Sequence, residues 1–308
     1  MSRIIVVGAG INGVTAAIEL KKRGHNVVLV DPGPLPHPFA ASTDISKAVR
    51  AAYGADEDYT DLATRSIELW RKWNQEFGTQ FYHEVGVMFV RRRELKPGDF
   101  EHESFKTLKR RGHKVERMNS ARLWKRFPAW NPELYRDGVL ELEAGYAESG
   151  RVVATLIERA KSLDIELREG VRFSQLHEED YGVSEIALDG GKRIAGDFVV
   201  MAVGAWTPYL LPFTKKFFRA SGQPVFHLKP RQPELFAPTE ISGARCYSRR
   251  RKEFARVSII HVPGAVQCAD CLLARLHVLR YARWAFLDRA RSGAPRINNC
   301  CGRLWAWV

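Results

Sequence analysis

The segment "RIIVVGAGINGVTAAIELKKRGHNVVLVD" (Arg3–Asp31) decides the fold. Its apolar start predicts a buried strand that runs into a glycine turn. Residues Ile11–Gly24 then show the apolar spacing of a helix, with Gly24 as its stop. The run "NVVLVD" (Asn26–Asp31) predicts a second buried strand that ends in an acid. Together these residues predict a βαβ unit of about 30 residues, the usual size.

Three glycines in this segment, Gly8, Gly10 and Gly13, form the pattern G-x-G-x-x-G, and Asp31 follows 18 residues after the last. Between a strand and a helix, this pattern predicts a dinucleotide site. Gly8 allows the tight turn, Gly10 lets the backbone approach a pyrophosphate, and Gly13 lets the helix pack on the strand. The helix start offers N–H groups and partial positive charge to phosphates. Asp31 can accept hydrogen bonds from ribose hydroxyls. The alternative is a tight turn without a ligand, and the motif alone fits FAD and NAD equally.

The remaining pattern predicts that the chain leaves the first sheet and later returns to it. A long amphipathic helix is expected at 56–78, followed by a mixed region. Strands are expected at 82–93, 136–143, 165–168, 171–176 and 183–188, and helices at 100–111, 120–127 and 149–164. Residues 197–206 are expected to form a buried strand that runs into a Gly-Ala-Trp turn. The sequence DGGKR at 189–193 has the chemistry of a hairpin turn.

Composition changes near residue 240. Residues 241–308 carry 13 Lys and Arg against 3 Asp and Glu, a net charge of +10 out of +13 for the chain. The five cysteines also lie in this part, at 246, 268, 271, 300 and 301. The pair Cys268–Cys271 lacks a second spaced pair, so no metal site is expected. The basic stretch 272–293 could bind nucleic acid or an anionic membrane surface.

The motifs GAGING near residue 8, VLVD at 28–31, STDISKAVRAAYG at 42–54, GYAESG at 145–150 and VVMAVGAW at 199–206 together resemble one family. It is the FAD-dependent D-amino-acid oxidase superfamily. The nearer resemblance is to the branch of sarcosine oxidase and fructosyl amino acid oxidases. The resemblance covers residues 3–238, and the segment DISKAVRAAYG is its most specific part.

The resemblance implies an α/β fold, in which a Rossmann-like FAD-binding domain carries an inserted mixed α+β substrate domain and is incomplete at its C-terminal end. The expected domains are 1–80 and 146–220 for FAD binding, 81–145 and 221–240 for the substrate domain, and 241–308 as an atypical basic tail. A shifted reading frame, retained intron or mis-joined gene would explain this tail. Missing final strands would leave an open sheet edge and a wet flavin pocket, and would weaken FAD retention.

The resemblance also implies roles for particular residues. Lys47 is expected beside the flavin ring, where a cation stabilises the negative charge of the reduced ring. Arg50 is expected to grip the substrate carboxylate, since a guanidinium can make two parallel hydrogen bonds. The alternative is an amphipathic helix with both side chains on a solvated face. The residues expected to bind the cofactor are Gly8, Ala9, Gly10, Ile11, Asn12, Gly13, Asp31, Pro32, Ser42, Thr43, Lys47, Phe173, Gly204 and Trp206.

For two residues, the sequence is consistent with either a functional or a structural role. Trp206 fits core packing as well as the flavin side, and His227 fits a structural role better than a place beside the substrate.

The implied activity is oxidation of the C–N bond of a secondary amine or N-substituted amino acid. Electrons pass to FAD and then to O2, giving H2O2. The alternatives are an NAD-linked dehydrogenase and a non-catalytic nucleic-acid binder, although the even charge before residue 240 speaks against the latter. A run of about 18 apolar residues is absent from the sequence, so no membrane span is expected. A cytoplasmic location is expected, or a peroxisomal one if the native C-terminus differs.

Overall fold

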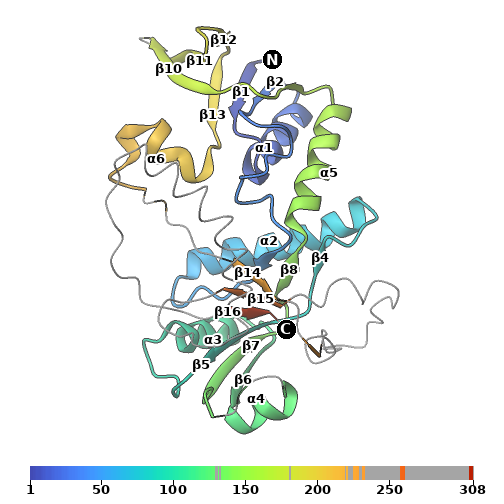
Figure 1. The fold of residues 1–308 in the computed structure, drawn as a ribbon, viewed down its shortest axis with the longest axis vertical. Coiled ribbons are helices and arrows are strands. Elements are labelled where there is room, and N and C mark those ends of the chain that lie inside the picture. Colours follow the sequence, from blue (N-terminus) through green and yellow to red (C-terminus); the bar gives the residue numbers. More distant parts are fainter. Residues whose placement is uncertain are drawn as a thin grey trace. The chain divides into compact units, whose positions relative to one another are not determined.

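The computed structural model describes residues 1–128, 131, 133–179, 182–218, 220, 225–228, 231–232, 257–260 and 305–307. The chain divides into two compact units, each assembled from three segments (Figure 1). The first comprises Met1–Lys47, Trp73–Tyr82 and Ala147–Ser221, and the second comprises Ala48–Lys72, His83–Tyr146 and Gly222–Val308. The domain boundaries expected from the sequence stay a prediction.

The first unit is built on a parallel sheet with the strand order β13-β1-β2-β9. Its strands are β1 (Arg3–Val7), β2 (Asn26–Val30), β9 (Glu166–Arg168) and β13 (Phe198–Met201). An antiparallel meander follows β9 and consists of β10 (Phe173–Glu179), β11 (Gly182–Leu188) and β12 (Arg193–Ala195). The helical elements are α1 (Ile11–Lys22), α5 (Ser149–Ser162), η1 (Gly204–Trp206), α6 (Thr207–Leu210) and η2 (Pro212–Thr214). The predicted βαβ start and return strand are confirmed.

The first unit has its core on the parallel sheet because β1 and β2 are apolar on both faces. Ile5 and Val7 of β1 pack in one cluster with Phe173, Ile186 and other residues of the meander. The alternate residues, such as Val6, are also buried and point to the opposite face. Helices α1 and α5 lie side by side in Figure 1 and each buries an apolar stripe. The meander and the helix pair therefore bury a sheet whose central strands need cover on both faces.

The second unit contains an antiparallel sheet with the strand order β14-β15-β16-β5-β7-β6. Its strands are β5 (Val87–Arg91), β6 (Val115–Asn119), β7 (Asp137–Glu141), β14 (Val225–Leu228), β15 (Val257–Ile260) and β16 (Trp305–Trp307). The helices outside the sheet are α3 (Phe100–Arg110), α4 (Ser120–Arg126) and most of α2 (Glu57–Glu76), whose residues from Trp73 onward belong to the first unit. Met88, Met118 and Leu140 form a core cluster with Leu123 and Phe127 from the α4 region.

Short strands lie where the chain passes from one unit to the other. They are β3 (Lys47–Val49), β4 (Tyr82–His83) and β8 (Gly145–Ala147). The single strand expected at 82–93 is wrong in detail, because a turn separates β4 from β5. In this turn the Val85 N–H donates to the His83 carbonyl at 3.1 Å, and Gly86 takes a φ of +85°. A positive φ of this size suits glycine, and it interrupts the extended strand at this point.

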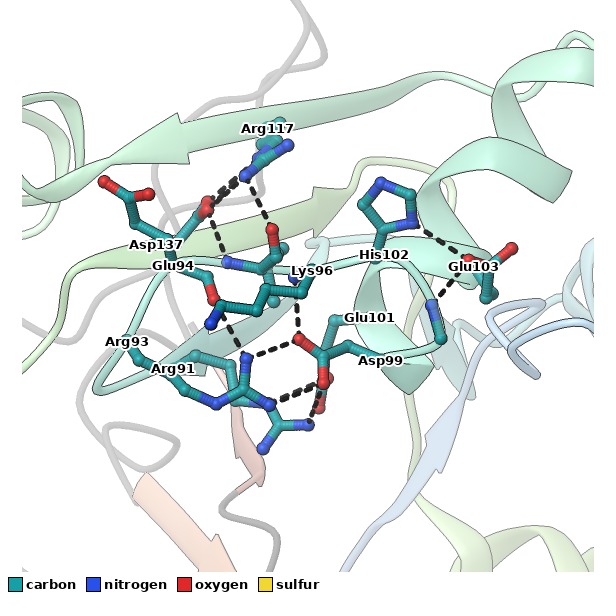
Figure 2. Close-up of polar contacts among 12 residues, drawn as sticks. Arg91, Arg93, Glu94, Lys96, Asp99, Glu101, His102, Glu103, Arg117 and Asp137 are labelled. Carbon is teal, nitrogen blue, oxygen red and sulfur yellow. Dashed lines mark hydrogen bonds and ion pairs between the residues drawn. The ribbon is translucent and has the colours of Figure 1, made fainter.

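Ion pairs hold the loop between β5 and α3 (Figure 2). The guanidinium of Arg93 donates to both oxygens of Asp99, at 2.7 and 2.5 Å. Arg117 donates to Asp137 at 2.5 Å, and the other end of the loop is fixed by the Leu95 N–H, which donates to the same carboxylate at 3.0 Å. The loop thus follows a path set by two carboxylates, each with a bound guanidinium.

We predict that Asp99 contributes its full stabilisation to the fold only above its unfolded pKa. Hydrogen bonds from Arg93 and from the Lys96 N–H hold the pKa of Asp99 well below its usual range. The contribution is therefore fully present above about pH 4 and is lost as the pH falls towards the folded pKa. Urea unfolding at several pH values should show that Asp99→Asn is less stable than the native chain at pH 7. This gap should close in acid, and a gap that stays constant down to about pH 2.5 would contradict the prediction. Glu19→Gln, which removes an exposed carboxylate, serves as the control.

Candidate cofactor and substrate sites

The glycine loop that follows β1 is packed so closely that side chains are excluded. Gly8 has a φ of +101°, and a Cβ there would lie 2.5 Å from the Ala202 carbonyl oxygen, just after β13. A Cβ on Gly13 would lie 1.7 Å from the carbonyl oxygen of Gly8. A Cβ on Gly10 would meet only the Ser42 hydroxyl, at 3.4 Å. The first and third glycines therefore serve the fold, whereas the second keeps the approach to the helix start open.

Asp31 lies at the end of β2, as the sequence predicts, and braces the glycine loop. Its side chain is buried, and one carboxylate oxygen accepts the Ala9 N–H at 2.8 Å. The other oxygen accepts the Gly33 N–H at 3.0 Å, and Pro32 between them is exposed. Each carboxylate oxygen has two lone pairs, so these bonds leave acceptor capacity for a ribose hydroxyl. The ribose contact stays a prediction.

The segment 40–47 is fixed across the starts of two helices. The Ser42 hydroxyl accepts the Ile11 N–H at 3.1 Å, which caps the first residue of α1. The Asp44 carbonyl accepts the Gly150 N–H at 2.8 Å and the Ser149 hydroxyl at 3.1 Å, at the start of α5. The expected cofactor-binding segment thus meets the amino ends of α1 and α5, where helix dipoles favour negative groups.

Lys47 is held by the same segment. Its ammonium nitrogen lies 2.6 Å from a carboxylate oxygen of Asp44, and the other oxygen of Asp44 accepts the Ile45 N–H at 2.7 Å. The alternative of an amphipathic helix is wrong here, because residues 40–54 contain the short strand β3 and otherwise irregular backbone. The side chain of Lys47 is 42% exposed, so it can still meet a ligand.

The donor and acceptor set in this part of the first unit fits FAD. The hydroxyl oxygen of Thr43 is buried and has no hydrogen-bond partner. A buried polar atom without a partner is costly, and a ligand group would satisfy it. Together with the open approach at Gly10, this atom matches a ligand that brings polar groups to the start of α1. The residues that would hold the ADP part are the glycine loop with Asn12, Asp31, Ser42 and Thr43.

The three expected cofactor-binding residues in the later part of the chain, Phe173, Gly204 and Trp206, lie in different surroundings. Phe173 is buried in the sheet core, so its side chain has a packing role. Gly204 has a φ of +53° and begins a turn that follows the strand packed against Gly8. Trp206 is 46% exposed and makes an edge-type ring contact with His37, with ring centroids 6.2 Å apart. The alternative that Trp206 packs in the core is therefore wrong. The cofactor-binding roles of all three residues stay predictions.

Arg50 belongs to the second unit and lies among aromatic rings. Its guanidinium carbon lies 4.3 Å from the ring centroid of Tyr53, with Phe89 and Phe100 at 5.9 and 5.7 Å. One guanidinium nitrogen donates to the Ala52 carbonyl. A guanidinium on aromatic faces is oriented by cation–π attraction. The side chain is partly buried and not on a solvated face.

Glu141 is a residue that the sequence analysis missed. It ends β7, is fully buried, and accepts the backbone N–H groups of Ala51 and Ala52 at 2.6 and 3.1 Å. Burial raises its pKa to about 7, against the lowering effect of the two N–H groups and of Arg50. The signal in the sequence was an acid within the apolar strand "GVLELE", but its partners lie some 90 residues earlier.

The part of the chain that the structure describes has neither a metal-binding cluster nor a membrane-spanning helix. Within it, His, Cys, Asp and Glu side chains do not gather in threes as a metal site requires. None of the helices in the same part is both long and apolar enough to cross a membrane. The side chain of His227, the five cysteines and the basic stretch 272–293 lie outside the described residues.

The fold and site define a dinucleotide-binding protein of the class that carries a redox cofactor. Residues 3–260 match the family model DAO, described as FAD dependent oxidoreductase. The chain therefore belongs to this family, and FAD is confirmed over NAD as the cofactor. The match runs beyond residue 238, where the resemblance was expected to end.

Relatives agree with the expected branch of the family. The chain is 26% identical to the N-methyl-L-tryptophan oxidase of Yersinia pestis (strain Pestoides F) over 212 residues, covering 68% of this chain and 55% of that enzyme. It shares its fold with a modified fructosyl peptide oxidase from Aspergillus nidulans at 20% identity and a TM-score of 0.67, covering 77% and 58% of the two chains. The L-proline dehydrogenase of P. horikoshii aligns with a TM-score of 0.60 at 21% identity, covering 73% and 59%. The chain spans little more than half the length of these relatives.

We predict that two glycine substitutions separate folding from cofactor binding. Gly13→Ala would place a methyl group against the Gly8 carbonyl oxygen, so thermal unfolding should show a large loss of stability. Gly10→Ala meets only the Ser42 hydroxyl, so the fold should persist. Its methyl group would point at the expected pyrophosphate position, and titration with FAD should show an affinity at least about tenfold weaker. Native FAD affinity in Gly10→Ala would contradict this placement.

Proposed function

We propose that the chain belongs to an enzyme that oxidises the C–N bond of an N-substituted amino acid. Support comes from family membership and from the names of relatives, which act on N-methyl-L-tryptophan and on fructosyl peptides. Because the chain spans 55% of the first of these relatives, the complete activity is part of the proposal.

One observation carries the proposal: the segment 40–47 lies across the starts of α1 and α5 and brings Lys47 with it. In this proposal the N–H groups at the start of α1 bind the pyrophosphate, and Asp31 binds the ribose. Lys47, held by Asp44, presents a cation to the redox ring. A cation placed in this way stabilises negative charge that develops during reduction.

Arg50 is the proposed substrate-binding residue. Its guanidinium offers paired donors to a carboxylate, and Tyr53 and the neighbouring rings orient it. An aromatic surrounding also suits the hydrocarbon part of a substrate.

The reaction is a two-electron oxidation. Bound FAD would supply the acceptor for the hydride equivalent that leaves the carbon next to nitrogen. The amine becomes an imine, which water hydrolyses to a carbonyl compound and a free amine. We propose O2 as the final acceptor, reduced by the same two electrons and two protons to H2O2. The residues of this chain bind and orient the reactants and lower the pKa of the substrate ammonium with their positive charge.

The test is oxidation of N-methyl-L-tryptophan by the chain purified with FAD, followed by peroxide release and by the flavin absorbance near 450 nm. A chain that binds no FAD, or an FAD-loaded chain that oxidises no N-methyl amino acid, would overturn the proposal.

We predict that Arg50→Met raises the KM for N-methyl-L-tryptophan by about thirtyfold or more, since a lost charge pair at a binding site costs at least about 2 kcal/mol. The flavin absorbance should stay as in the native chain. Arg193→Met, which removes an exposed guanidinium paired with Glu185, is the control and should leave KM unchanged. An unchanged KM in Arg50→Met would show that this residue does not bind the carboxylate.

A further inference from the structure

A buried carboxylate supports the backbone that carries Arg50. Both oxygens of Glu141 accept backbone N–H groups, at 2.6 Å from Ala51 and 3.1 Å from Ala52. These are the two residues that directly follow Arg50 in the chain. Glu141 and Ala51 and Ala52 are all fully buried, so water does not compete for these bonds.

The direction of the Arg50 side chain depends on the same short segment. Its guanidinium bonds the Ala52 carbonyl and lies on the ring of Tyr53. Both partners are within three residues of Arg50, so their positions follow from the backbone angles of residues 51–53. Glu141 holds the backbone of the first two of these residues through their N–H groups.

The two buried N–H groups need acceptors, because a buried donor without a partner destabilises the fold. A carboxylate supplies both acceptors but brings a charge into the interior, which itself costs several kcal/mol. Burial is also the main influence on the pKa of Glu141. What a carboxylate provides, and an apolar side chain cannot, is two acceptors for adjacent N–H groups and a negative charge near Arg50.

We propose that Glu141 is a positioning residue, which fixes the backbone of Ala51 and Ala52 and so aims the guanidinium of Arg50 at the substrate carboxylate. The inference rests on the proposed function, in which Arg50 binds that carboxylate. It assigns Glu141 no direct contact with the substrate.

Asp137 provides a matched comparison on the same strand. It is also a buried carboxylate, and it accepts the Leu95 N–H at 3.0 Å and pairs with Arg117. Its partners are Leu95, in the loop between β5 and α3, and Arg117 of β6, so none of them belongs to residues 50–53. Asp137→Asn therefore reproduces the loss of a buried negative charge from β7 without altering the support of Arg50.

The experiment compares Glu141→Gln with Asp137→Asn on two amines, one with a carboxylate and one without. Glutamine keeps the size of the side chain but presents an NH2 group to one of the two N–H donors. Glu141→Gln should raise the KM for N-methyl-L-tryptophan by about tenfold or more, the cost of one lost charge-assisted bond. The KM for N-methyltryptamine, which lacks the carboxylate, should change less than about twofold. Asp137→Asn should change neither KM.

The pH dependence gives a second readout that a purely structural role would not move. The charged groups that act on Glu141 are Arg50 and Glu143, and Glu143 itself pairs with His113. Because the pKa of Glu141 is raised to about 7, protonation in slightly acidic solution removes one acceptor. The KM for N-methyl-L-tryptophan should therefore rise from about pH 8 to pH 6 more than that for N-methyltryptamine. In Glu141→Gln this difference should vanish.

The outcomes separate the two proposals. If Glu141→Gln matches Asp137→Asn on both amines while the native chain is active, the positioning role is overturned and the proposed function stands. If the native chain and Asp137→Asn respond to neither amine, the proposed function fails and the inference fails with it. Should Glu141→Gln not unfold cooperatively, Glu141→Asp replaces it. This variant keeps both oxygens but is one methylene short of Ala51 and Ala52, so the same selective rise in KM is expected and its absence overturns the role.

Discussion

The hydrogen bond from the Ala9 N–H to Asp31 joins the ends of β1 and β2, and the cofactor side of the first unit depends on it. The bond fixes the turn in which Gly8 packs against the Ala202 backbone and Gly13 against Gly8. That turn sets where α1 begins, and the start of α1 in turn receives the Ser42 hydroxyl. A buried carboxylate that accepts backbone N–H groups thus determines both the shape of the glycine loop and the position of the segment beside it.

The second unit uses the same device at a different place. Glu141 accepts two adjacent N–H groups and so shapes residues 51 and 52, as Asp31 shapes the glycine loop. In both cases the acid lies at the end of a buried strand and acts on backbone rather than on side chains. Carboxylates suit this purpose because they only accept hydrogen bonds when ionised and offer two oxygens. Each of these acids lies next to a segment that we connect with a ligand.

The sequence predicted the parts of the fold that rest on local patterns. The first βαβ unit follows from unbroken apolar strands and a glycine loop, and both are visible within 30 residues. The strand β6 was missed because "VERMN" alternates weakly and lies at a sheet edge. The turn at Gly86 was missed because one glycine does not reveal its φ. Glu141 was missed because its role depends on two alanines whose N–H groups carry no mark in the sequence.

The parallel sheet of the first unit joins residues from the two ends of a long stretch of chain. Ile4 of β1 pairs with Phe198 of β13, and the Arg3 N–H donates to Asp197 across 194 positions. During synthesis on the ribosome, β1 therefore has one hydrogen-bonding side without its native neighbour until residue 201 has emerged. At about 5–20 residues per second this interval lasts on the order of ten to forty seconds. Until then, that side of β1 is an unpaired strand edge, which is the kind of surface through which incompletely folded chains aggregate.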